Sequence, residues 1–455
     1  MTAGMPLGVV QQDEQCLAGD RVVRAVFESG LVGYVVPKPG FRQKYAVVGF
    51  RYGSLDSRFW RDDRPEPVSV PDGIAHFLEH KLFEKEDGDV FSRFARLGAS
   101  ANAYTGYSMT AYLFSAVDHF PEALQVLLEF VQRPYFTEAS VRKEQGIIEQ
   151  ELRMYEDDPG RCLFVNLMQA LYQVHPVRIE IGGTVDSIRR IEVDALYLCH
   201  ATFYRPSNAV LAVAGDVEPQ DVWKIVGPLM GVRQDGTDPG VSVRRLDPQE
   251  PEEVRSARVE KPLAVSRPRL ALGIKDVPAY RSGRSLVVRD LALNIALEAA
   301  FGRASDTYRA LYEDGLIDDG FGARYIIDTR FAHTVMGGET PDPERLEARL
   351  REALEELRQR GLSQEDFERL RRRHTGELIA SMDNPEMVAN GLVALHFRDT
   401  SLAQYLEVLE ELTLEEVNRA VAEHVAPHRM AVSVVVPGGE PARTRAGRSE
   451  QADEG

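Results

Sequence analysis

Two histidines and a glutamate stand close together in the segment GIAHFLEHKLF at positions 73–83. His76 and His80 are four residues apart, and Glu79 directly precedes the second histidine. Residues i and i+4 of a helix project from the same face, so both imidazoles can bind one zinc ion. Glu79 lies near that face and can reach a water molecule bound to the ion. The order HxxEH is the inverse of HExxH and is itself a metallopeptidase signature.

An ordinary polar helix surface is the alternative interpretation of this segment. Apolar residues surround the three polar ones, namely Ile74, Phe77, Leu78, Leu82 and Phe83. They predict a helix that is largely buried. Buried histidines and a buried glutamate need partners, and a metal ion supplies them. The surroundings therefore favour a metal site over a polar surface.

A catalytic zinc ion needs a third protein ligand and one open position. The segment KEQGIIEQELRMYEDD at 143–158 is the best source of an acidic ligand on a second helix. Helical periodicity places Glu144, Glu151 and Tyr155 on one face, together with Ile148, whereas Glu149 and Glu156 point elsewhere. One of the two inward glutamates can bind the metal while the other orients a ligand histidine. Periodicity alone leaves open which glutamate has which role.

The elements that must position these residues alternate between strands and helices. Four short segments with alternation, three of them containing β-branched residues, predict strands, namely RYGSLD (51–56), AYLFSAV (111–117), NAVLAVAGDV (208–217) and RPRLALGIKDV (267–277). Longer amphipathic stretches, such as 121–133 and 343–361, predict helices. The pattern indicates an α+β protein with two domains, at 1–246 and 268–437. The charged segment 247–267 is the predicted linker, and 438–455 is a predicted disordered tail.

An internal repeat supports the division into two halves. Residues 137–159 align without gaps with 363–385, which pairs Glu151 with Glu377 and Pro159 with Pro385. Further along, 204–213 aligns with 425–434 at nearly the same offset. The sequence therefore predicts a duplicated α+β unit. Only the first copy carries HFLEH, because the second has NIALE (294–298) in that place.

Composition and charge narrow the class of protein. The chain has 455 residues and a formal net charge of −17, so its surface as a whole repels nucleic acid. Its three cysteines form no CxxC pair and indicate reduced thiols. We recognise neither a signal peptide nor a membrane-spanning apolar run in the sequence. We therefore expect a cytoplasmic protein that binds neither nucleic acid nor a membrane.

With these motifs in hand, the sequence resembles the pitrilysin/insulinase family of zinc metallopeptidases over about residues 40–437. The resemblance is carried by GIAHFLEHKLF, GASANAYTGYSMTAY (98–112), EQGIIEQE (144–151), HPVRIEIGGTVDSI (175–188) and FYRPSNAVLAVAGDV (203–217). It is strongest with the small bacterial cytoplasmic members, which often act as pairs. The implied fold is two homologous α+β halves, each a mostly antiparallel sheet covered by helices, facing each other around a chamber.

The resemblance also implies roles for individual residues. It assigns His76, His80 and Glu151 as ligands of one zinc ion per chain, Glu79 as the catalytic base and Glu144 as the glutamate that supports the site. The segment SANAYT resembles the family's edge strand that pairs with the backbone of a peptide substrate. Its residues are Ser100, Ala101, Asn102, Ala103, Tyr104 and Thr105. In strand addition the protein binds the main chain of the peptide and not its side chains, which suits loose sequence specificity.

One departure from the family pattern concerns the second half. Active members carry an arginine and, about seven residues later, a tyrosine that stabilise the developing oxyanion. The corresponding stretch here is LYEDGLIDD (311–319), with Tyr312 in place of the arginine and Asp318 or Asp319 in place of the tyrosine. We therefore expect a heterodimer in which a second insulinase-like subunit supplies the Arg/Tyr pair.

Three classes of function remain open on this evidence. The first is a zinc endopeptidase that hydrolyses peptides or unfolded segments. The second is a non-catalytic, peptidase-like structural or peptide-binding subunit, which would have no need of an intact HFLEH. The third is a zinc hydrolase of a non-peptide amide, which rests on the ligand set alone. The sequence favours the endopeptidase.

Overall fold

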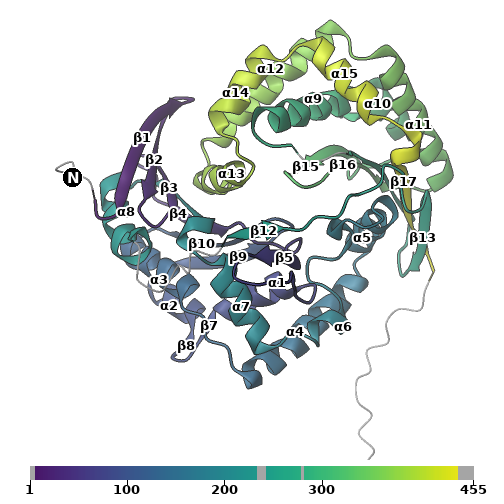
Figure 1. The fold of residues 1–455 in the computed structure, drawn as a ribbon. Helices are drawn as coiled ribbons and strands as arrows, with labels where there is room; N and C mark the ends of the chain where they lie inside the picture. Colours follow the sequence, from purple (N-terminus) through teal and green to yellow (C-terminus); the bar gives the residue numbers. More distant parts are fainter. Residues whose placement is uncertain (1–5, 233–241, 278–280, 439–455) are drawn as a thin grey trace, which may run out of the picture.

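The computed structural model describes residues 6–232, 242–277 and 281–438, and it consists of two α+β halves (Figure 1). The first half contains a seven-stranded sheet in the order β1-β2-β3-β11-β4-β10-β9. Its strands are β1 (Val9–Leu17), β2 (Asp20–Phe27), β3 (Val32–Pro37), β4 (Lys44–Phe50), β9 (Ser100–Thr105), β10 (Thr110–Ala116) and β11 (Ala209–Gly215). Only the pair β3 and β11 is parallel among these strands. The sheet is thus mostly antiparallel, as predicted.

Eight α-helices of the first half accompany this sheet. They are α1 (Ile74–Leu82), α2 (Val90–Arg96), α3 (Phe120–Gln132), α4 (Glu138–Glu156), α5 (Pro159–Leu171), α6 (Val185–Ile188), α7 (Val193–Phe203) and α8 (Pro219–Val226). Small sheets are formed by β5 (Arg58–Arg61), β6 (Val68–Ser69) and β12 (Val243–Arg245), and by β7 (Glu84–Lys85) and β8 (Gly88–Asp89). Every residue of β11 is buried, because both faces of the sheet are covered at this central strand.

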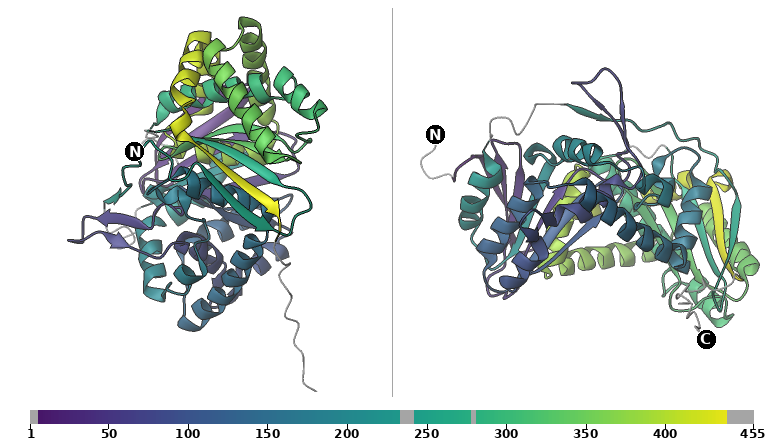
Figure 2. Two further views of the ribbon diagram at one scale, coloured as in Figure 1. Left: turned by 90° about the vertical axis from the view of Figure 1, so that its right-hand side faces the viewer. Right: turned by 90° about the horizontal axis from the view of Figure 1, so that it is seen from below.

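The second half repeats this plan with a five-stranded sheet in the order β13-β17-β14-β16-β15. Its strands are β13 (Arg258–Leu263), β14 (Arg269–Lys275), β15 (Gly322–Ile327), β16 (Ala332–Glu339) and β17 (Met430–Pro437). Its helices are α9 (Gly283–Phe301), α10 (Asp306–Glu313), α11 (Pro343–Arg360), α12 (Gln364–Ser381), α13 (Pro385–Phe397), α14 (Leu402–Glu411) and α15 (Leu414–His424). The helical layers of the two halves lie at opposite ends of the molecule, with strands between them (Figure 2, left).

The structure confirms the predicted duplication. Helix α4 corresponds to α12, α5 to α13 and β11 to β17, as the alignment of 137–159 with 363–385 and of 204–213 with 425–434 requires. Both sheets contain one parallel pair at the same place, β3 with β11 and β13 with β17. The second-half counterpart of HFLEH lies in helix α9.

Each half covers the sheet of the other with one helix. Helix α13 packs on β11 and β4 of the first sheet, where Val393 and Phe397 join Val47, Val210 and Ala212 in one core. Helix α5 packs on β14 and β17 of the second sheet. The approach is so close that a Cβ on Gly49 would lie 2.5 Å from Val393 Cγ1. Helices α13 and α5 thus lie where the two halves pack against each other.

Buried ion pairs reinforce this contact between the halves. The Arg330 guanidinium, from the turn between β15 and β16, donates to Asp56 Oδ1 of the first half at 2.6 Å. It also donates to Asp247 in the connecting segment at 2.9 Å. Asp56 further accepts a hydrogen bond from Arg245 at 3.0 Å. These ion pairs therefore join the turn at Asp56 and the connecting segment to the second half.

Two sequence predictions need correction. RYGSLD (51–56) is not a strand but a turn, because Asp56 donates its N–H to the Gly53 carbonyl and accepts the Gly53 N–H. The predicted linker 247–267 is too long, since 258–263 forms strand β13 of the second sheet. We propose 246–257 as the connection between the halves. Of the predicted tail at 438–455, residues 439–455 lie outside the described residues.

Candidate metal centre

Helix α1 carries both histidines. It begins after Gly73, whose φ of 87° favours glycine and turns the chain into the helix. Its apolar side, including Phe77 and Leu78, is buried in the core of the first half, as the sequence predicted. The two imidazoles project together from the other side, with ring centroids 4.5 Å apart. The i, i+4 spacing thus brings two metal-binding groups into contact.

Helix α4 carries the acidic groups. Thr137 and Ser140 form a reciprocal capping box at its start, which fixes where the helix begins and which residues face α1. Glu144 and Ile148 are buried against the core, and Glu151 follows one turn later on the same face. The predicted shared face of Glu144 and Glu151 is therefore observed.

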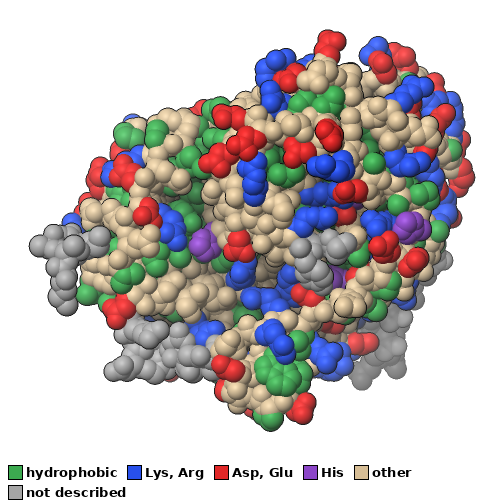
Figure 3. Space-filling model, turned by 45° about the horizontal axis from the view of Figure 1, so that its top comes forward, with side chains coloured by type: hydrophobic (Ala, Val, Ile, Leu, Met, Phe, Trp, Pro, Cys, Tyr) green, Lys and Arg blue, Asp and Glu red, His purple; other side chains and the backbone are tan. Residues whose placement is uncertain are grey.

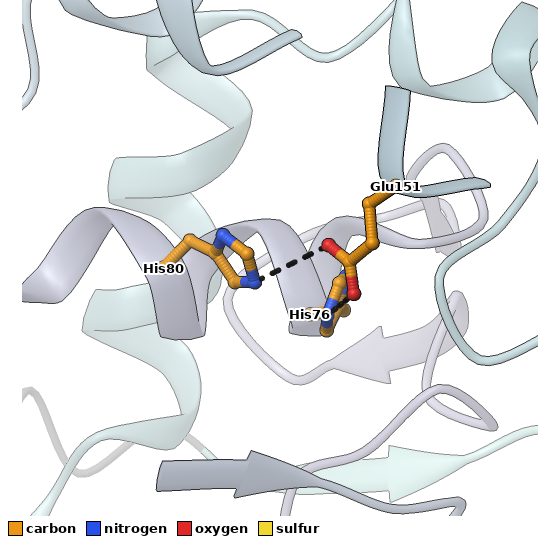
Figure 4. A group of neighbouring side chains, drawn as sticks. All are labelled: His76, His80 and Glu151. Atoms are coloured by element: carbon orange, nitrogen blue, oxygen red, sulfur yellow. Dashed lines mark ion pairs between the residues drawn. The ribbon is translucent and has the colours of Figure 1, made fainter. Parts of the chain in front are cut away.

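His76, His80 and Glu151 converge on one point (Figure 4). Glu151 Oε1 lies 3.8 Å from His76 Nε2, and Glu151 Oε2 lies 3.7 Å from His80 Nε2. One ligand atom of each residue lies within 4.8 Å of the other two, and no other such group is found in the described part of the chain. Donors of a tetrahedral zinc ion are about 3.4 Å apart. The two Glu151 distances exceed this value by only a few tenths of an ångström, and two imidazoles with one carboxylate are donors that zinc binds.

Glu144 supports the second histidine. Its Oε1 lies 3.1 Å from His80 Nδ1, which leaves His80 Nε2 directed towards Glu151. Burial acts to raise the pKa of Glu144, but the hydrogen bond with His80 together with the charges of His80, Lys81 and Lys143 outweighs this, and the pKa is lowered. Burial and the neighbouring His80 lower the pKa of His76 to about 4, so this imidazole is neutral and able to bind a metal.

Glu79 lies on the same helix, between the metal cluster and the edge of the sheet. Its Oε2 accepts a hydrogen bond from Thr105 Oγ1 at 2.7 Å. Burial raises the pKa of the Glu79 carboxyl, although the bond from Thr105 opposes the shift. A carboxylate held in this way keeps one oxygen free for a proton.

Thr105 ends strand β9, the edge strand of the seven-stranded sheet. Strand β9 pairs with β10 on one side only, among the strands that the structure describes. Ala101 and Ala103 pack against the core of the first half, whereas Ser100, Asn102 and Tyr104 are exposed. The predicted substrate-binding segment 100–105 is therefore an edge strand joined to Glu79 through its last residue.

Several candidates from the sequence lie away from the cluster. Glu149 forms ion pairs with Arg153 and Arg189, and Glu156 is exposed, as the periodicity indicated. Tyr312, at the position of the family's arginine, stacks on Tyr308 and is 49% exposed.

The sequence missed three residues next to the metal cluster. The Tyr155 hydroxyl donates to Glu151 Oε1, Arg161 lies over the Tyr155 ring, and Glu180 pairs with Arg161. Periodicity placed Tyr155 on the correct helix face without giving it a role. Arg161 and Glu180 come from other segments, and no local pattern links them to Glu151.

In the second half, charged side chains fill the corresponding place. Glu298, the counterpart of His80, pairs with Arg373 at one oxygen and with His374 Nε2 at 3.0 Å. Both Arg373 and His374 come from α12, the counterpart of α4. A cavity of about 730 Å³ lies beside them, lined also by Asn294 and Arg324. An arginine and a histidine thus contact Glu298 where the first half offers metal ligands.

The surface shows no basic stripe on the face drawn in Figure 3. Lysine and arginine side chains are interspersed there with aspartate and glutamate. None of the helices in the described ranges is long and apolar enough to cross a membrane.

Two models of known protein families match this chain. Residues 67–185 match the family described as insulinase (peptidase family M16), and residues 190–373 match the peptidase M16 inactive domain. The three converging side chains and Glu79 all fall within the first match. Glu298 and Arg373 fall within the second, whereas His374 follows directly after its end.

Individual relatives agree with this match. The chain is 42% identical over 410 residues to the uncharacterized zinc protease YmfH of Bacillus subtilis, covering 90% of this chain and 95% of the relative. It is 24% identical to the uncharacterized zinc protease YmxG of the same organism, covering 81% and 89%. A crystal structure of an M16-like peptidase from Alicyclobacillus acidocaldarius superimposes with a TM-score of 0.86 at 36% identity, covering 96% of this chain and 100% of that one.

Proposed function

This chain belongs to peptidase family M16, the insulinase family, and we propose that it is a zinc-dependent endopeptidase that hydrolyses peptides or unfolded segments. The observation that carries the proposal is the convergence of two imidazoles and a carboxylate beside a fourth side chain able to act as a base. Two histidines and one carboxylate leave a fourth position open, which is typical of catalytic and not of structural zinc sites.

Each residue of the cluster would have a distinct role. His76, His80 and Glu151 hold one zinc ion, and Glu144 orients His80 through its Nδ1. The bound ion supplies Lewis acidity, which activates water and polarises a carbonyl. Glu79 accepts the proton of the attacking water and delivers it to the leaving amine. Thr105 holds the Glu79 carboxylate in place for both transfers.

Substrate would bind along the free edge of β9. An extended peptide that pairs with Ser100–Thr105 forms main-chain hydrogen bonds with the strand and runs past Glu79. Recognition by main chain requires no particular side chains. This arrangement supports a peptide substrate over the amide of a small molecule, because only a peptide can extend the sheet.

A second subunit would complete the active site. The positions of the family's arginine and tyrosine hold Tyr312 and Asp318 or Asp319 in this chain, so oxyanion stabilisation is undersupplied. A homodimer would bring the same residues and would not repair this. We therefore propose a heterodimer with an insulinase-like subunit that carries the Arg/Tyr pair. Loss of one oxyanion donor typically costs a hundredfold or more in rate.

The missing Arg/Tyr pair also favours an alternative, which is a non-catalytic role. In that case the chain would bind peptides without cleaving them. The experiment is to measure zinc content and the cleavage of a quenched fluorescent peptide, with the purified chain alone and mixed with a candidate insulinase-like subunit. One zinc per chain with cleavage only in the mixture supports the heterodimeric peptidase. Full activity of the chain alone refutes the shared site, and zinc without cleavage in either sample refutes the peptidase.

A further inference from the structure

Tyr155 contacts the carboxylate that we assign to the metal. It follows Glu151 by four residues on α4, and its hydroxyl donates to Glu151 Oε1. Both oxygens of Glu151 also face the imidazoles, Oε1 towards His76 and Oε2 towards His80. The hydroxyl therefore restrains the carboxylate at the point where its orientation decides whether it can bind a metal.

Arg161 holds the ring of Tyr155 from the outside. Its guanidinium carbon lies 3.4 Å from the ring centroid, which is a stacked cation–π contact. The position of Arg161 is fixed twice. Its backbone N–H donates to Asp158 Oδ1 at 2.6 Å in the cap of α5, and its guanidinium donates to Glu180 Oε1 at 2.5 Å.

Glu180 belongs to the segment 175–188, which the fold wraps over the metal cluster. Two residues later, a Cβ on Gly182 would lie 2.9 Å from Leu152 and 3.6 Å from His76 Nδ1. The segment therefore packs directly on both helices that carry the ligands. Within the motif HPVRIEIGGTVDSI, a larger residue at position 182 would therefore force Leu152 to move.

We propose that Tyr155 is a positioning residue for Glu151, and that Arg161 and Glu180 hold Tyr155 in place. The inference rests on the proposed function, because it requires Glu151 to bind zinc. A glutamate side chain has three rotatable bonds, and fixing its carboxylate before the metal arrives removes part of the entropy cost of binding. Partners of this kind typically change metal affinity by about 10–100-fold.

Two tyrosine variants distinguish a positioning role of Tyr155 from a purely structural one. Tyr155 is half-buried and its hydroxyl points at the ligand carboxylate. Tyr155→Phe removes this hydrogen bond and leaves the packing of the ring unchanged. Tyr197→Phe is the matched control, because the Tyr197 hydroxyl also forms hydrogen bonds, to the backbone of Phe136 on another part of the first half.

The test is competition for zinc between the metal-free chain and a chelator. We expect the zinc Kd of Tyr155→Phe to rise about 10–100-fold and that of Tyr197→Phe to stay within about twofold. Cobalt(II) substitution gives a second readout, since its visible absorption spectrum reports the ligand geometry. The spectrum should change in Tyr155→Phe and not in the control. Unchanged zinc affinity and cobalt spectrum in Tyr155→Phe would overturn the positioning role.

Arg161 provides an independent arm of the test. Arg161→Lys keeps the positive charge but loses the planar group that stacks on Tyr155. It should weaken zinc binding in the wild-type background and add little in the Tyr155→Phe background, because both changes act through one contact. Additive effects would show that Arg161 does not act through Tyr155. A wild-type chain that binds no zinc would instead refute the proposed function, so the two failures are distinguishable.

Discussion

Replacing Glu79 by glutamine separates proton transfer from every other property of the centre. Glu79 is 8% exposed, and its Oε2 accepts the hydrogen bond from Thr105 at 2.7 Å. A glutamine has nearly the same shape, and its carbonyl oxygen can accept the same bond. The substitution should therefore leave helix α1 and the three converging side chains in place, while removing the only function that an amide cannot perform, which is to accept a proton.

The expected size of the effect follows from these contacts. A positioned general base contributes about 100- to 10,000-fold in rate, which corresponds to about 2.7–5.5 kcal/mol of the barrier. Thr105→Val keeps the base but removes the bond that holds it. We expect a smaller loss of about tenfold for Thr105→Val, because the buried carboxylate still faces the site. Comparing the rate losses of Glu79→Gln and Thr105→Val separates the contribution of proton transfer from the contribution of carboxylate placement.

The assay is cleavage of a quenched peptide by whichever preparation is active in the wild type, the chain alone or its complex. Zinc content and the midpoint of thermal unfolding are measured on the same samples. Glu156→Gln is the matched control, because Glu156 is exposed at the end of α4. Turnover of Glu79→Gln within tenfold of wild type, with zinc retained, would refute the assigned role of Glu79.

Three further predictions test other parts of the structure. Glu151→Gln should lose zinc while Glu149→Gln retains one ion per chain, as measured by metal analysis, and equal retention would contradict the ligand assignment. Gly49→Ala should lower the free energy of unfolding by about 1–3 kcal/mol, because its Cβ would lie 2.5 Å from a valine of α13, whereas Gly146→Ala, in open space on α4, should raise it by about 0.5–1 kcal/mol in urea unfolding. Burial lowers the pKa of His200 to about 4, so the unfolded chain takes up the proton first as the pH falls below about 6.5. The free energy of unfolding of the zinc-free chain should then fall by about 1.4 kcal/mol per pH unit for this histidine, and His200→Gln should make the fall measurably shallower.

The sequence predicted the parts of the structure that depend on local spacing. His76, Glu79 and His80 share one helix, so the i, i+4 rule was sufficient to bring the imidazoles together. Strands 111–117 and 208–217 were found because both are short runs of mostly apolar residues. The repeat of α4 and α5 in α12 and α13 was visible because both copies kept the same length and the same proline at the start of the second helix.

Other features depend on contacts between distant segments. Periodicity could not distinguish Glu144 from Glu151, because both face α1 and only the distances to the two imidazoles separate their surroundings. RYGSLD was predicted as a strand, but Gly53 and Asp56 form a turn that packs against the backbone of Tyr107, and the Gly, Ser and Asp of this segment are residue types that favour turns. Strand β13 was assigned to the linker because it is a half-exposed edge strand with weak hydrophobic alternation.

The exchange of helices α5 and α13 between the sheets has a consequence for how the protein is made. A ribosome completes the seven-stranded sheet when it reaches β11, yet the apolar face around Val47 and Val210 has no cover until Pro385–Phe397 has been synthesised. The apolar face of helix α5 is likewise uncovered until β14 and β17 have been synthesised, and β17 lies near the end of the described chain. The two cores that join the halves therefore cannot close until the second half has been synthesised. The helices of the zinc ligands are translated early and pack in a core made of first-half residues alone, so the ligand scaffold can form before the two halves are joined.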